Sequence, residues 1–85
     1  MNNKSKIAVI EIIELFRGRL EGERLNDCRS DAEHGEWGMA FENLCTQLEE
    51  FDVLPNEHEY QAIRTAGESM EIDPQNWNFL APNKN

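Results

Sequence analysis

The segment EHGEWGMAFENLCTQLEEF, which runs from Glu33 to Phe51, decides the fold that this sequence predicts. From Trp37 onward its apolar residues recur every three or four positions, which is the spacing of one face of an α-helix. That apolar face consists of Trp37, Ala40, Phe41, Leu44, Cys45, Leu48 and Phe51. The segment therefore predicts a core helix in which Trp37 is mainly structural. Gly35 is expected to end the preceding helix, and Gly38 to let another backbone come close.

The opposite side of the same helix is acidic. It carries Glu36, Glu42, Asn43, Thr46, Glu49 and Glu50. Met39 lies among these residues, on the wrong side for the core. This side is either a solvated face or a surface that meets another protein, and exposed Met39 and Trp37 would equally suit a homodimer.

The flanking segments predict further helices. Residues 5–20 have an apolar face wider than half the circumference, which is typical of a central helix contacted on several sides. A short second helix is expected to start at Asn26 or Asp27, either of which can cap it, and to end at His34-Gly35. Asn56 and Glu59 have the spacing of a capping box for a helix over residues 57–71.

Asp73-Pro74 is a second start signal, with aspartate as the cap and proline at the first helical position. The short turn that follows carries Trp77, Phe79 and Leu80, which we expect to close the core. The sequence thus predicts an all-α domain over residues 1–85, a small bundle of four to five short helices around a single core. Residues 1–4 and 82–85 are expected to be disordered.

The net charge of −9 is unevenly distributed. Residues 1–29 hold six basic and five acidic side chains, whereas residues 30–85 hold two basic and twelve acidic ones. The negative electrostatic field of such a protein repels phosphate groups. Direct binding to nucleic acid or to an anionic membrane is therefore not expected. The same field attracts basic proteins and accelerates their encounter.

Residue types that carry chemistry are sparse. Cys28, His34, Cys45 and His58 are single residues at long separations, which lack the close pairing of a zinc site. We expect the two thiols to be reduced and to pack as small apolar residues, and His34 to lie at a helix end. No phosphate-binding loop or nucleophile elbow is present. We therefore expect neither an enzyme nor a metal or cofactor site, and a cytoplasmic protein without a signal peptide or membrane span.

The run from Glu33 to Glu42, followed by Leu44-Cys45 and by Gln47 to Glu50, resembles the signature of the MafI family of immunity proteins. Asp73-Pro74 and Trp77 match the end of the family pattern, and the resemblance extends over about residues 8–80. It implies a small cytoplasmic protein that binds the toxin domain of its own secreted polymorphic toxin. Toxins paired with this family include ribonucleases of the EndoU type.

Charge and resemblance together suggest a function. The RNA-binding groove of a ribonuclease is usually basic, so an acidic surface would find it quickly and exclude RNA. The expected partner-binding residues are Glu36, Met39, Glu42, Asn43, Glu49, Glu50, Asp52, Glu57 and Glu68. Met39 would be the apolar anchor, and a monomer in the complex is favoured. The alternative is a small acidic helical adaptor that binds a basic regulatory protein.

Overall fold

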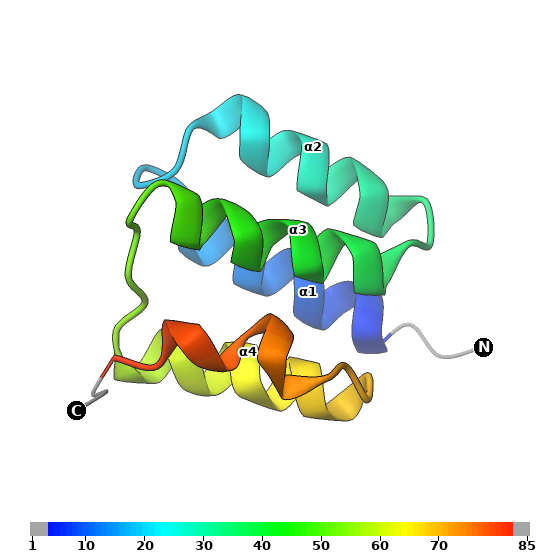
Figure 1. Ribbon diagram of the computed structural model, residues 1–85. Coiled ribbons are helices and arrows are strands. Elements are labelled where there is room, and N and C mark those ends of the chain that lie inside the picture. Colours follow the sequence, from blue (N-terminus) through cyan, green and yellow to red (C-terminus); the bar gives the residue numbers. More distant parts are fainter. Residues whose placement is uncertain (1–3, 83–85) are drawn as a thin grey trace.

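Four α-helices and two short 3-10 helices make up residues 4–82, the part of the chain that the computed structural model describes (Figure 1). In chain order they are α1 (Lys4–Leu15), α2 (Gly22–Glu33), α3 (Trp37–Glu50), α4 (Glu57–Ser69), η1 (Pro74–Asn76) and η2 (Asn78–Leu80). Their buried side chains form one core, so the predicted all-α bundle with a single core is confirmed.

Helix α1 lies at the centre of the bundle. It packs against α2, α3 and α4, as its wide apolar face predicts. The side toward α2 and α3 buries Val9, Ile13 and Phe16 completely. Leu15 was expected on that face too, but 39% of it is exposed. Helix α3 lies between α2 and the two 3-10 helices, which cover α4 in Figure 1.

The predicted end of the first helix and the predicted start of the second are wrong. Helix α1 ends at Leu15 rather than at residue 20, because the chain turns at Gly18, whose φ is +94°. Helix α2 starts at Gly22 rather than at Asn26 or Asp27, and neither residue caps it. The early start places Leu25 in the helix, where it is fully buried.

The boundary between α2 and α3 matches the prediction. His34 is the C-cap of α2 and lies within hydrogen-bond distance of a backbone carbonyl, with 2.7 Å between its Nδ1 and the oxygen of Ser30. Gly35 follows with a φ of +90°, a left-handed conformation that glycine adopts without strain. Trp37 then opens α3 and packs against the core while remaining half-buried.

Phe51 departs from the predicted apolar face of α3. The helix ends at Glu50, and Phe51 is its C-cap with 43% of its surface exposed. The guanidinium of Arg24 lies 4.4 Å from the centre of the Phe51 ring. Asp52 has a φ of +56° and turns the chain away, so Phe51 covers the surface of α2 instead of entering the core.

Both predicted caps in the C-terminal half are confirmed. The Asn56 side chain accepts a hydrogen bond from the Glu59 backbone, and the Glu59 side chain accepts one from the Asn56 backbone. Asp73 caps η1 by accepting a hydrogen bond from the Gln75 backbone. Trp77 and Leu80 are buried behind it, and they close the core as expected.

The close approach expected at Gly38 occurs at Gly67 instead. A Cβ atom built on Gly38 would meet nothing within 4 Å. One built on Gly67 would lie 2.5 Å from Nε1 of Trp77. The indole therefore rests directly on the α4 backbone, a contact between segments that helical periodicity does not reveal.

The expected disorder of the chain ends falls mostly on residues 1–3 and 83–85, which lie outside the described residues. Two of the residues expected to be disordered are described: Lys4 is the first residue of α1, and Pro82 lies in a turn.

Candidate functional site

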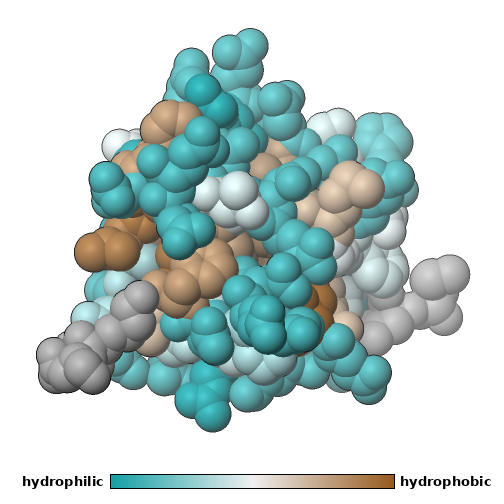
Figure 2. Space-filling view, viewed as in Figure 1, coloured by the Kyte–Doolittle hydropathy of each residue, from teal (hydrophilic) through white to brown (hydrophobic). Residues whose placement is uncertain are grey.

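The predicted partner-binding residues gather mainly on the outer face of α3. We use this name for Glu36, Met39, Glu42, Asn43, Glu49 and Glu50, all of which are exposed. They lie there because α3 turns its apolar residues inward, with Phe41, Leu44 and Leu48 fully buried. Met39 stands out as a large apolar side chain with 52% of its surface exposed. Figure 2 shows the side of the molecule on which α3 lies in front in Figure 1, and its surface is mainly hydrophilic with several apolar areas between.

The carboxylates of this face are not paired with cations in the described part of the chain. In residues 4–82, none of Glu36, Glu42, Glu49 and Glu50 has an ion pair or a side-chain hydrogen bond. Carboxylates without cations beside them retain their full field, and that field points away from the core toward any approaching molecule.

The arginines explain why the negative charge remains at α3. Every arginine forms an ion pair with a glutamate outside the outer face of α3. The pairs are Arg17–Glu14, Arg19–Glu59, Arg24–Glu21, Arg29–Glu14, Arg29–Glu33 and Arg64–Glu68. The arginines are thus engaged in ion pairs away from α3, and the carboxylates on the outer face of α3 have no arginine partner.

Asp52 extends the outer face of α3 at its C-terminal end. It follows the helix directly, is exposed, and has no ion pair among the described residues. Leu54, two residues further on, is 69% exposed. With Phe51, it places apolar surface beside the acidic end of α3, a combination that the sequence pattern did not single out.

Glu57 and Glu68 do not join this face. Both lie on α4, whose main neighbour is α1 rather than α3. The Glu68 carboxylate pairs with Arg64 at 3.1 Å, and Glu57 accepts a hydrogen bond from Gln61 at 3.0 Å. Their exposure was predicted correctly, but they form a separate surface whose charge is partly compensated.

Helix α2 adds two acids that sequence reasoning did not assign to the site. Arg24 donates to Gln47 of α3 at 3.4 Å, which shows the side of α2 that borders α3. Asp27 and Asp31 follow Arg24 along that border at helical spacing, and the Asp31 carbonyl accepts from the Glu36 backbone at 2.9 Å. The signal that would have found them is the i, i+3, i+7 spacing from Arg24.

The two buried cysteines are in the protonated thiol form at neutral pH. Burial raises the pKa of Cys28 to about 11, with smaller contributions from the charges of Asp31 and Asp27. Burial also raises the pKa of Cys45 to about 12, with a contribution from Glu42. Both cysteines are free and buried, and at neutral pH they are thiols packed in the core, as predicted.

Residues 4–82 contain neither a cluster suited to a metal ion nor a helix suited to span a membrane. No three residues of the histidine, cysteine, aspartate and glutamate types come together there in a way that could hold a metal ion. No helix in that part of the chain has the length and apolarity needed to cross a membrane.

Comparisons of the chain with protein-family models, with curated proteins and with solved structures find no match.

Proposed function

We propose that this chain is an immunity protein, which binds and neutralises the toxin domain of its own secreted bacterial toxin. The toxin is a ribonuclease, with the EndoU type as the first candidate, and the chain itself needs no cofactor. The observation that carries the proposal is the outer face of α3, where uncompensated carboxylates surround exposed Met39. The resemblance of residues 33–50 to the MafI signature supports the same function.

The arrangement suits inhibition of an enzyme that binds RNA. A ribonuclease groove presents cations to the phosphates of RNA, and carboxylates on a rigid helix offer those cations an alternative partner. Steering by the opposite charges makes association fast, and Met39 provides the desolvated apolar contact that holds a complex together. Inhibition then follows from occupation of the groove and requires no reaction on the immunity protein.

The site is rigid enough for this role. Helix α3 is anchored by five buried residues, Ala40, Phe41, Leu44, Cys45 and Leu48. Its outward side chains therefore keep a constant spacing, and little backbone ordering is needed on binding. In the cytoplasm of the producing cell, where we place this protein, it would meet the toxin before secretion.

The test is co-expression with the toxin domain encoded beside this gene, followed by co-purification and an RNA-cleavage assay. We expect a stable complex and loss of cleavage. The double variant Glu42→Lys/Glu49→Lys should weaken binding by about 100-fold, because each reversal turns an attraction into a repulsion. The matched control is Glu23→Lys/Glu71→Lys, which makes the same change in net charge at exposed acids elsewhere.

Two results would contradict the proposal. If the adjacent toxin is neither bound nor inhibited, the chain is not its immunity protein. The alternative function, an acidic adaptor that binds a basic regulatory protein, is then favoured. If the toxin is bound equally well by both double variants, the immunity function stands but the outer face of α3 is not the interface.

A further inference from the structure

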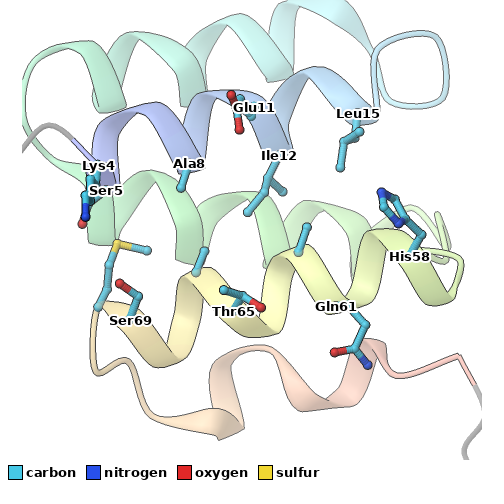
Figure 3. A pocket seen from close by; sticks show the side chains of 13 residues that line it. Lys4, Ser5, Ala8, Glu11, Ile12, Leu15, His58, Gln61, Thr65 and Ser69 are labelled. Atoms are coloured by element: carbon cyan, nitrogen blue, oxygen red, sulfur yellow. The ribbon is translucent and has the colours of Figure 1, made fainter.

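A groove of about 520 Å³ runs between α1 and α4, on the side of the molecule away from the outer face of α3 (Figure 3). The two helices are antiparallel along it. Lys4 and Ser69 lie at one end in Figure 3, and Leu15 and His58 lie at the other. The surface of the groove is mainly apolar, and it is open to solvent.

Six residues of α1 line the groove, and four of them form a single stripe. Lys4, Ala8, Glu11 and Leu15 are spaced four, three and four residues apart, which aligns them along one side of the helix. This is the spacing with which helices pack side by side. The stripe borders α4 across the groove, and 39% of Leu15 is exposed.

The charges of this groove differ from those of the rest of the molecule. Lys4 and Glu11 have opposite signs, and His58 is the only other ionisable side chain that lines it. The groove therefore has no net charge when His58 is neutral, although the chain carries −9. The charges that line the groove therefore add no local repulsion between two copies, in contrast to those on the outer face of α3.

The spacing of the two charges is also self-complementary. When two α1 helices pair antiparallel about a two-fold axis beside Ala8, Lys4 of each copy lies against Glu11 of the other. The small side chain of Ala8 at the crossing point permits close approach of the helices. The C-terminal end of α1 in one copy, at Leu15, then lies near the N-terminal end of α1 in the other copy. Met70 lines the groove at that N-terminal end.

We propose that the α1–α4 groove is the interface of a symmetric homodimer, in which α1 of a second copy occupies the groove. The dimer joins α1 and α4 of both copies into a four-helix layer and leaves the outer face of α3 free on each copy. This inference goes beyond the proposed function and does not depend on it, since no toxin is needed to test it.

The experiment measures the mass of the purified chain in solution by light scattering and sedimentation equilibrium over a range of concentrations. We expect a species of about 20 kDa, twice the 9.9 kDa of one chain. Lys4→Glu and Glu11→Lys should each raise the dimer dissociation constant about ten-fold, because each change creates two repulsive pairs across the axis. The double variant Lys4→Glu/Glu11→Lys should restore the original dissociation constant.

A second pair of variants tests the groove independently of these charges. Thr65→Arg places a long cation on the α4 wall and should give a monomer. Ser30→Arg makes a comparable change at an exposed position of α2 and should leave the dimer intact. Far-UV circular dichroism and thermal unfolding confirm that each variant is folded.

Three outcomes would overturn the inference. The first is a 9.9 kDa species at about 1 mM, a concentration at which even a millimolar interface is half populated. The second is a dimer that survives Thr65→Arg, which would place the interface elsewhere, for example around Met39. The third is additive weakening in the charge-swapped double variant, which would show that Lys4 and Glu11 do not face each other across the interface.

Discussion

Gly67 lies where the C-terminal segment meets α4, and its missing side chain makes room for Trp77. The indole is 4% exposed and lies close enough to the helix that a Cβ atom on Gly67 would be 2.5 Å from its Nε1. The indole also meets the ring of Tyr60 from the same helix, with 6.2 Å between the ring centres. Glycine is unfavourable inside a helix, so its presence here is explained by this packing contact.

Gly67→Ala should therefore lower the free energy of unfolding by about 1–2 kcal/mol. The displaced indole costs more than the helix gains from the better propensity of alanine. The matched control is Gly38→Ala, where a Cβ atom meets open space and the change should raise the free energy of unfolding by up to about 1 kcal/mol. Urea denaturation of the three proteins measures both differences, and effects of the same sign would refute the packing argument.

At the scale of the elements, Glu14 connects α1 to α2. Its carboxylate accepts hydrogen bonds from Nε of Arg17 at 3.0 Å and from Nη1 of Arg29 at 2.8 Å. Arg17 also donates to Asn26 at 3.0 Å, and Arg29 also donates to Glu33 at 3.0 Å. This network spans the turn where the predicted helix ends were wrong, and it engages Asn26, the residue expected to cap α2.

The network gives the stability a defined pH dependence. The hydrogen bonds from Arg17 and Arg29 lower the pKa of Glu14 to about 2, from an ordinary value of 4.5. Because the pKa is lower in the folded state, the contribution is fully present above about pH 4.5 and is lost as the pH falls toward 2. The groups are partly exposed, so we expect the contribution to be about 1 kcal/mol or less.

Glu14→Gln should accordingly reduce the free energy of unfolding at pH 7, and its difference from the original protein should shrink as the pH falls below 4.5. Glu42→Gln is the control, since Glu42 is exposed on α3, has no ion pair among the described residues and lies outside the proposed dimer interface. Denaturation series at several pH values compare the three proteins. A Glu14→Gln difference that stays constant between pH 7 and pH 2 would show that the carboxylate charge is not responsible.

For the whole molecule, the distribution of charge matters more than the total of −9. Each arginine is paired with a glutamate away from the outer face of α3, so the four carboxylates of that face have no arginine beside them and can attract a basic partner. At 0.1 M ionic strength, salt largely screens such attraction at separations beyond about 10 Å, so raising the salt concentration shortens its range. The field therefore acts chiefly on the approach of the partner.

The association rate constant for the toxin domain should consequently fall steeply as salt is raised, while the dissociation rate constant changes little. The association rate constant of the Glu42→Lys/Glu49→Lys variant should change much less with ionic strength than that of the Glu23→Lys/Glu71→Lys variant. Stopped-flow measurements at several salt concentrations determine both slopes. Equal slopes in the two variants would mean that net charge alone, and not its location on α3, guides the encounter.

The sequence by itself determined the helices, their buried faces and three of their boundaries. The apolar spacing of α3, the capping box at Asn56 and the cap at Asp73 are local features, each encoded within a few residues. The exposure of Met39 among acidic residues was likewise predicted from the helical periodicity. Local periodicity suffices for these features because a helix places each side chain at a known angle about its own axis.

Only the tertiary structure decided which helices are neighbours, and that decided the shape of the candidate site. Asp27 and Asp31 approach α3 because α2 packs beside it, whereas Glu57 and Glu68 are separated from it because α4 packs on α1. The early start of α2 and the contact of Trp77 with Gly67 are likewise set by partners distant in the chain. The physical reason is that periodicity gives the direction of a side chain relative to its own helix, while packing in the shared core decides what that side chain meets.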